Sequence, residues 1–352
     1  MTFMESWTIL HREKTDSQTA ARKHFSGNDA KREDFISCAP YKPAGKIVVT
    51  KTKPDQRTIT YTYDDAGRLL TRVYPGGAAD NFTYDENNNI LTAANTVIAY
   101  NYAYDAANRM TGVMDSNSRG FTYACDTAGN RTSMITPDNV TTNYVYDDAN
   151  RLTTITNNTG TYSFDYDFAG RRTTLTYPGG ATAAYAYDAN GNLLNVLHAR
   201  NGATLLQPMY TYDQVNNRIT RTDTLPTSAG NNLLENMTHN EANEQLNINT
   251  ATYTYDANGN RASKTEGTNV TTYTYDDENR LIQVSTNGAT IATYAYDPFG
   301  RRIQKNVGGT ITHYVYDNED IILEYNTGNQ ITARYTHGPG IDRCVDQVGT
   351  AD

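Results

Sequence analysis

A nine-residue phrase, YTYDANGNR at 253–261, recurs in close variants along most of the chain. The aspartates that follow the Tyr-x-Tyr part are spaced mostly 20 or 21 residues apart, and they are Asp64, Asp85, Asp105, Asp126, Asp147, Asp167, Asp188, Asp213, Asp256, Asp276, Asp297 and Asp317. A degenerate copy, MTHNEANEQL, fills the long gap between Asp213 and Asp256 with Asn240 in the Asp position. A fixed period of this length indicates a repeat architecture, in which each unit is stabilised mainly by its neighbours.

The phrase itself predicts a β-hairpin. Tyr-x-Tyr places two rings on one face of a strand, because side chains alternate with a period of two. The Asp accepts backbone N–H groups at a turn, and three residues later almost every copy has Gly or Asn, which tolerate positive φ. The turn positions with glycine are Asp64 with Gly67, Asp126 with Gly129, Asp167 with Gly170, Asp188 with Gly191, Asp256 with Gly259, and Asp297 with Gly300. A second turn in each repeat is indicated by YPGGA at 74–78 and 177–181, NNTGT at 157–161 and TNGAT at 286–290.

Thirteen such hairpins predict roughly 26 strands, or about 120 Å of sheet, which would twist too strongly to stay flat and open. We therefore expect an all-β fold in which antiparallel β-hairpins of about 21 residues form a coiled or spiral sheet, as an open or partial hollow shell. Three regions are expected: a charged, irregular segment at 1–57, the hairpin strip at 58–335, and a C-terminal turn segment at 336–352.

Tyrosine is the unusual component, with 28 Tyr against 8 Phe and 1 Trp, and 21 of the 28 occupy the repeat positions. Rings at repeat positions favour stacking across strands, which holds a sheet together. The alternative is that flat rings and nearby polar groups bind carbohydrate. The candidates for glycan stacking or sheet stacking are Tyr185, Tyr187, Tyr253, Tyr255, Tyr273, Tyr275, Tyr294 and Tyr296.

The charge of the chain is divided unevenly. Residues 1–57 hold 11 basic and 7 acidic residues, a net +4, and the remainder holds 19 basic and 32 acidic residues, a net −13. An acidic body repels phosphates, so no nucleic-acid partner is expected. The first 25 residues contain no apolar stretch of the kind found in a secretory signal, and no run is long enough for a membrane helix.

Catalytic and metal chemistry have little support in the sequence. DANGN at 188–192 and 256–260 offers oxygen ligands, but it lacks the glycine and carboxylate spacing of a Ca²⁺ loop, so it is interpreted as a turn. His337, Asp342 and Cys344 form one local cluster on a Gly-Pro-Gly turn, which favours a structural role over a nucleophile. The histidines lack zinc-ligand spacing. We expect no catalytic residue, no metal and no cofactor, and hence no enzyme.

The repeated Y-x-Y-D-x-x-G-R-L phrase resembles the YD repeats of Rhs proteins, of Tc-toxin C components, of wall-associated proteins and of teneurins. The resemblance covers about residues 58–335, and YTHGPGID at 335–342 is similar to the segment that follows the repeats in Rhs proteins. It implies a strip of β-hairpins that spirals into a hollow shell around a C-terminal toxin. The Asp-Pro-x-Gly-Leu signature of the family's self-cleaving core domain is absent, so the segment at 336–352 is expected to be truncated relative to the family.

The resemblance implies a non-enzymatic shell segment that encloses or presents a downstream toxin or effector segment. The alternative is a cell-surface adhesion or fibre protein that binds cell-surface carbohydrate or associates with itself through Tyr-rich hairpins. Both interpretations place the protein outside the cell or on its surface, exported without a visible N-terminal signal peptide and without a membrane span.

Overall fold

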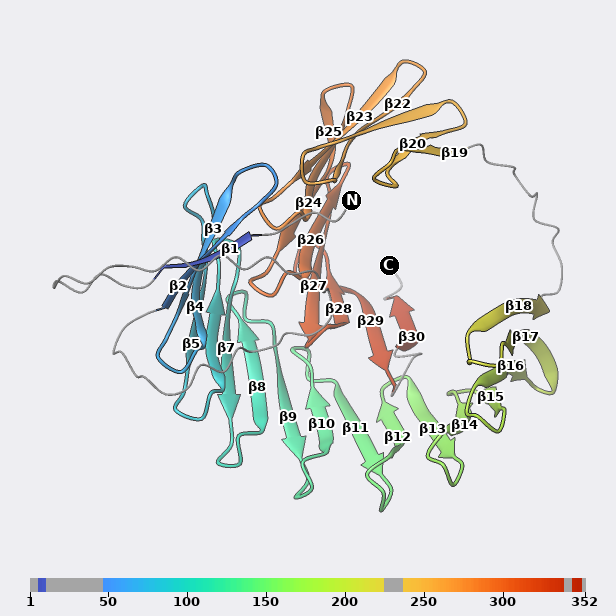
Figure 1. The fold of residues 1–352 in the computed structure, drawn as a ribbon. Helices are drawn as coiled ribbons and strands as arrows, with labels where there is room; N and C mark the ends of the chain where they lie inside the picture. Colours follow the sequence, from blue (N-terminus) through green and yellow to red (C-terminus); the bar gives the residue numbers. More distant parts are fainter. Residues whose placement is uncertain (1–5, 11–46, 225–236, 339–343, 350–352) are drawn as a thin grey trace.

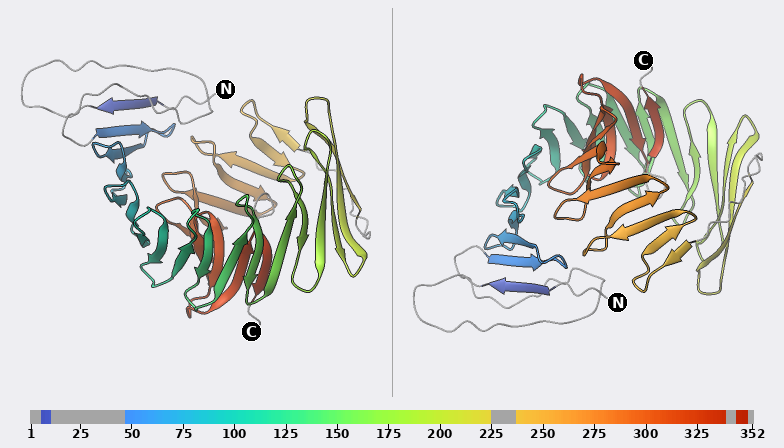
Figure 2. Two further views of the ribbon diagram at one scale, coloured as in Figure 1. Left: turned by 90° about the horizontal axis from the view of Figure 1, so that it is seen from below. Right: turned by 90° about the horizontal axis from the view of Figure 1, so that it is seen from above.

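The computed structural model of the chain describes residues 6–10, 47–224, 237–338 and 344–349. These residues form β-strands joined by turns and contain no helix. Two sheets result, one of β1–β18 and one of β19–β30, and within each sheet the strands pair antiparallel with their neighbours along the chain. The predicted all-β fold of repeated hairpins is confirmed, and the strip curves around a hollow centre without closing into a barrel (Figures 1 and 2).

The strands of sheet one are β1 (Ser6–Leu10), β2 (Ile47–Thr52), β3 (Thr58–Tyr63), β4 (Leu69–Val73), β5 (Ala79–Tyr84), β6 (Ile90–Ala94), β7 (Ala99–Tyr104), β8 (Met110–Asp115), β9 (Gly120–Cys125), β10 (Arg131–Ile135), β11 (Thr141–Tyr146), β12 (Leu152–Asn157), β13 (Gly160–Tyr166), β14 (Arg172–Thr176), β15 (Ala181–Tyr187), β16 (Leu193–Arg200), β17 (Ala203–Tyr212) and β18 (Arg218–Thr224).

The strands of sheet two are β19 (Met237–His239), β20 (Gln245–Ile248), β21 (Ala251–Tyr255), β22 (Arg261–Glu266), β23 (Asn269–Tyr275), β24 (Leu281–Thr286), β25 (Ala289–Tyr296), β26 (Arg302–Val307), β27 (Thr310–Asp317), β28 (Asp320–Tyr325), β29 (Ile331–His337) and β30 (Cys344–Gly349).

Three strands lie outside the predicted strip at 58–335, namely β1, which pairs with β2, together with β2 and β30. β2 begins at Ile47, pairs with β3 and is joined to it by a turn at 53–57, so part of the segment predicted to be irregular belongs to the sheet. Its run of β-branched residues, Ile47 to Thr50, is typical of a strand. At the other end, β29 continues to His337 and β30 pairs with it, within and beside the predicted turn segment at 336–352.

The two faces of the strip differ in burial. On β9, Phe121 and Tyr123 are 2% and 8% exposed, whereas Thr122 and Ala124 on the other face are exposed. The exposed face carries hydroxyl pairs across neighbouring strands, such as Thr62–Thr71 and Thr83–Thr92. We call the two faces the tyrosine face and the threonine face. This alternation follows directly from the Tyr-x-Tyr spacing.

Each hairpin also contains a β-bulge beside its second tyrosine. Opposite Thr62 and Tyr63 the partners are Thr71 and Leu69, so Leu70 is an extra residue. The same shift recurs in the other hairpins of both sheets, for example at Tyr146 and Tyr296. A bulge bends its strand and increases the local twist, so one bulge in each hairpin curves the whole strip.

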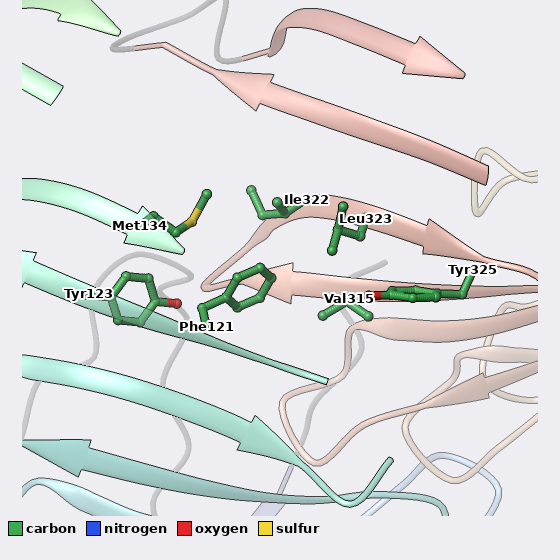
Figure 3. Packing of buried hydrophobic residues seen from close by; sticks show 7 residues of the cluster. All are labelled: Phe121, Tyr123, Met134, Val315, Ile322, Leu323 and Tyr325. Carbon is green, nitrogen blue, oxygen red and sulfur yellow. The ribbon is translucent and has the colours of Figure 1, made fainter. Parts of the chain in front are cut away.

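Sheet two packs back onto sheet one, and one hydrophobic core lies between them (Figure 3). Phe121, Tyr123 and Met134 of sheet one contact Val315, Ile322, Leu323 and Tyr325 of sheet two. A smaller cluster joins Ile98 and Tyr100 to Ile303. A third cluster, which contains Ile155 and Leu175, is formed by sheet one alone. The strip therefore makes a second winding that lies on the tyrosine face of the first.

Candidate functional site

The repeated turn, which we call the Asp turn, is held by one carboxylate. Asp64 Oδ1 accepts the N–H groups of Ala66 and Arg68 at 2.9 Å, and Asp64 Oδ2 accepts Arg68 Nε at 2.6 Å. The Gly67 N–H donates to the Asp64 carbonyl at 3.0 Å. The loop thus has three residues and ends at a residue with positive φ, which is +79° for Gly67. These backbone N–H bonds to the carboxylate, together with the Arg68 guanidinium, hold the pKa of Asp64 below its usual value.

The structure places all of the predicted Asp and Gly positions in Asp turns. The third loop residue has φ of +79° at Gly67, +93° at Gly129, +77° at Gly170, +88° at Gly191, +80° at Gly259 and +84° at Gly300. The carboxylates of Asp126, Asp167, Asp188, Asp256 and Asp297 accept the same two backbone N–H groups as Asp64 does. The degenerate copy also forms this turn, with Asn240 as the acceptor and Asn243 at positive φ.

Successive Asp turns are joined by a ladder along one edge of the strip. In sheet one, where an Arg follows the third loop residue, its guanidinium reaches the next Asp carbonyl, as Arg171 does to Asp188 at 3.2 Å. Where the shorter Asn stands there, it donates to an Asn side chain of the next turn, as Asn130 does to Asn150 at 2.9 Å. Asn260 makes the same contact with Asn279 at 3.1 Å in sheet two. An Asn at the third loop position thus accepts a hydrogen bond from the Asn that follows the third loop residue of the preceding repeat, so the residues at these two positions are coupled.

The tyrosines proposed for stacking have contacts inside the sheet. The second Tyr of a repeat donates its hydroxyl to a carbonyl of the preceding hairpin: Tyr187 to Arg172, Tyr255 to Gln245 and Tyr296 to Leu281. Arginine guanidinium groups lie 4.3–5.5 Å from the ring centres of Tyr185, Tyr187, Tyr253, Tyr294 and Tyr296. All eight candidates, with Tyr273 and Tyr275 included, are buried or half-buried. Their proposed binding of carbohydrate stays a prediction.

The contact between the two windings, which we call the seam, includes buried charge. The Asp297 side chain is 0% exposed and is held by its own turn N–H groups, by Arg301 Nε at 2.6 Å and by the Tyr100 hydroxyl of sheet one at 3.2 Å. Burial, reinforced by the Asp297 charge, raises the pKa of Tyr100 well above its usual value. The phenol therefore stays neutral and serves as a donor across the seam.

A second buried carboxylate of sheet two binds sheet one in the same way. The Tyr123 hydroxyl donates to Asp317 Oδ1 at 3.0 Å, and the Arg131 guanidinium forms an ion pair with the same carboxylate. Burial alone would lower the pKa of Arg131, but the hydrogen bond and charge of Asp317 raise it instead. Arg131 also lies over the Tyr123 ring, 4.3 Å from its centre.

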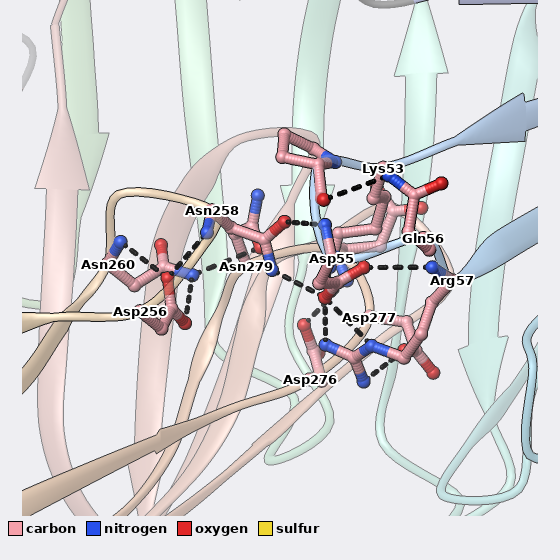
Figure 4. Close-up of polar contacts among 12 residues, drawn as sticks. Lys53, Asp55, Gln56, Arg57, Asp256, Asn258, Asn260, Asp276, Asp277 and Asn279 are labelled. Atoms are coloured by element: carbon pink, nitrogen blue, oxygen red, sulfur yellow. Dashed lines mark hydrogen bonds and ion pairs between the residues drawn. The ribbon is translucent and has the colours of Figure 1, made fainter.

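At the start of the strip, the β2–β3 turn is joined to two Asp turns of sheet two (Figure 4). Asn258 Nδ2 donates to Asp55 Oδ2 at 2.6 Å, and Arg57 Nη1 lies 2.6 Å from Asp277 Oδ1. Although burial opposes it, hydrogen bonds from Arg57 and Asn258 lower the pKa of Asp55 strongly. The tips of Asp turns in the second winding therefore meet the turns at the other edge of the first winding, which we call the opposite edge.

The two residues that follow the Asp in each Asp turn form its tip, and tips make much of the seam. Phe299 lies 5.9 Å from Phe82 and 6.3 Å from Tyr100, measured between ring centres. Arg72 donates to the Pro298 carbonyl at 2.7 Å. In sheet one every tip residue is exposed, and Phe168 reaches 112%. A large apolar residue at a tip is therefore not a sufficient sequence signal for the seam, because Phe299 packs there whereas Phe168 is exposed.

The proposed His337, Asp342 and Cys344 cluster is only partly described. His337 Nε2 lies 2.7 Å from the Ile321 carbonyl, and its backbone pairs with that of Cys344. Asp342 lies outside the described residues. Within 47–224 and 237–338, no group of three or more His, Cys, Asp or Glu side chains is arranged to hold a metal ion. No helix among the described residues is long and apolar enough to cross a membrane.

Comparison with known proteins identifies a family over most of the chain. The sequence profile of the teneurin YD-shell family matches residues 40–177 and 162–338. No curated protein matches the sequence. The crystal structure of TcdB2-TccC3-TEV is similar at 13% identity and a TM-score of 0.43, over 92% of this chain and 24% of that one. The Tc holotoxin pore of Photorhabdus luminescens is similar at 12% identity and a TM-score of 0.33, over 87% and 22% respectively.

Proposed function

This chain belongs to the teneurin YD-shell family, and we propose that it forms a non-enzymatic part of the wall of a hollow shell that encloses or presents a downstream polypeptide effector. The observation that carries the proposal is the seam. A strip that served only to display its surface would not need buried charge between its windings, whereas a wall must keep its windings in contact. Asp297 and Asp317 provide those contacts from inside a packed core.

The architecture supports containment rather than chemistry. The wall is a sheet whose hydroxyl-bearing threonine face is exposed. Its buried carboxylates Asp80, Asp297 and Asp317 each face an arginine, whereas the buried Asp115 accepts the backbone N–H groups of Asn117 and Arg119. Each carboxylate of these three ion pairs is thus engaged within the wall. The charged groups of the seam are thus better suited to hold the wall than to act on a substrate.

Protease protection tests the proposal. A flexible peptide with one protease site would be joined after Asp352, and its rate of cleavage compared with that of the same peptide on an unrelated globular protein. We expect protection by the shell, and loss of protection in an Asp297→Ala variant whose seam is weakened. Cleavage of the peptide at the control rate in the wild-type chain would reject enclosure.

The same proposal includes a location outside the cytoplasm, either secreted or on the cell surface. Fractionation of the producing cells, followed by detection of the chain with an antibody, tests it. Recovery only from the cytoplasmic fraction, with lysis controls clean, would contradict this part of the proposal and leave the containment test unaffected.

A further inference from the structure

One edge of the molecule is uncovered although it carries the same turns that form the seam. The Asp turns of sheet one point downward in Figure 1 along β9–β14. Their tips include Phe168, 112% exposed, and Val215, 74% exposed, as well as the exposed acidic residues Glu86 and Asp148. In sheet two the equivalent acidic tip residue Asp277 forms an ion pair with Arg57, and the aromatic tip residue Phe299 packs on Phe82.

The opposite edge of sheet two is the counterpart of the surface that receives these tips. Its turns lie at the upper end of Figure 1, between β22 and β23 and between β24 and β25. Beside the turns at this edge are three exposed apolar residues, Val270 at 40%, Ile291 at 44% and Val307 at 47%. Single exposed residues of this kind are ordinary on a surface, but here they recur hairpin after hairpin along one edge.

The strand register places basic residues on the same edge. In sheet one Arg72 pairs with Tyr61, the first tyrosine of its repeat, and contacts a tip of the second winding. In sheet two Lys305 pairs with Tyr294 and Lys264 pairs with Tyr253, which are the equivalent positions, and Lys264 also forms an ion pair with Glu266 at 2.6 Å. The opposite edge of sheet two thus presents Lys305 and exposed apolar residues, a combination similar to the basic and apolar residues that bind tips within the chain.

We propose that a second copy of this chain docks here, head to tail, so that the Asp-turn edge of sheet one in one copy lies on the opposite edge of sheet two in the next. The contact continues the internal seam from one molecule into another. The two surfaces lie at opposite ends of the molecule and differ from each other, so the contact is heterologous and extends into a chain of copies rather than closing a dimer. This inference does not depend on any cargo.

Complementary variants test the proposal in the full chain. Phe168→Asp would disable the lower surface, and Ile291→Asp with Lys305→Glu would disable the upper one. Val145→Ser, at a 54% exposed position on the threonine face, is the matched control. Sedimentation velocity over a range of protein concentrations, with circular dichroism to confirm folding, gives the size of each species.

We expect wild type and Val145→Ser to form larger species as concentration rises, and each disabled variant to weaken association by about tenfold or more. Because each disabled variant retains one working surface, a mixture of the two should form dimers and nothing larger. Low salt should strengthen the contact, since it pairs acidic tips with lysines. A wild-type chain that stays monomeric, a mixture that stays monomeric, or a Phe168→Asp chain that associates like wild type would overturn the proposal.

Discussion

Phe299 and Phe168 occupy the tips of two Asp turns with the same backbone. Phe299 packs on three aromatic rings and is 41% exposed, whereas Phe168 is fully exposed. Gly300 and Gly170 close these turns at φ of +84° and +77°, and both Asp side chains accept the same backbone N–H groups. The difference arises only from what lies across from the turn. Local sequence therefore determines the hairpin, and the path of the whole strip determines which hairpins become part of a core.

The largest difference is expected at the carboxylates. Asp297 is 0% exposed and faces Arg301 and Tyr100, whereas the Asp167 side chain is 22% exposed and faces solvent beside Arg171. Asp297→Ala leaves a buried guanidinium without its partner and should lower the free energy of unfolding by about 3–5 kcal/mol. Asp167→Ala should cost much less, because its carboxylate is partly exposed. Urea unfolding of both variants measures this, and equal losses would mean that the seam adds nothing to the turn.

At the third loop residue the difference between the two turns should vanish. Gly300→Val and Gly170→Val each place a β-branched residue at positive φ, at a cost of about 1–3 kcal/mol. A side chain at either site has room, because the nearest atom to an added Cβ is 3.7 Å away at Gly300 and more than 4 Å away at Gly170. Gly→Asn at both sites is the control and should be nearly neutral, since Asn150 adopts this conformation. Calorimetric melting that separates the two Val variants would show that packing, not backbone strain, decides their stability.

Truncation of the two tip rings measures the seam itself. Phe299→Ala removes contacts with Phe82, Tyr100 and Tyr102, and should lower the free energy of unfolding by about 1–2 kcal/mol. At low protein concentration, where the copies are separate, Phe168→Ala should change it by less than about 0.5 kcal/mol. Denaturant titration followed by tyrosine fluorescence gives both values. A comparable loss in the free energy of unfolding for Phe168→Ala would mean that the Phe168 ring packs against another part of the chain.

The smallest effect should be shared by the two sheets. The amide pairs Asn130–Asn150 in sheet one and Asn260–Asn279 in sheet two have the same geometry. Double-mutant cycles with Ala at the first residue and Gly at the second should give a coupling of about 0.5–1 kcal/mol in each sheet. Asn130→Ala combined with Asn192→Ala, which are not in contact, is the additive control. Coupling in one sheet only would show that the ladder depends on its position in the spiral.

The hairpins could be predicted from the sequence because the residues that determine each hairpin lie within one repeat. The Tyr-x-Tyr alternation, the Asp acceptor and the residue that tolerates positive φ all act within one repeat, and Gly67 and Asp64 lie as that argument requires. The predicted start of the strip at 58 was later than the observed strand at Ile47, since the β2–β3 turn lacks the Tyr-x-Tyr-Asp phrase. The β-bulge beside Tyr63 could not be predicted either, because no residue type marks it.

The seam lay beyond sequence reasoning for a different reason. Tyr100 meets Asp297 only after many hairpins have each added a small bend, and no local pattern records the sum of those bends. A signal did exist in the tips, where Phe299 and Phe168 stand among mostly small or polar residues. That signal marks turns suited to docking, but it does not identify the surface that receives them.

The even curvature of the strip has a consequence for how such a chain can change length. Partners across the seam are separated by 179 to 226 residues, so one circuit takes roughly ten repeats. Insertion of a single repeat between Phe82 and Phe299 would shift the two windings by one repeat, so that a different tip lies opposite each receiving site. Repeats added beyond the ends of the circuit leave the existing alignment intact. The contacts across the seam therefore fix the number of repeats between them, and repeats can be added at the ends of the strip more easily than in its middle.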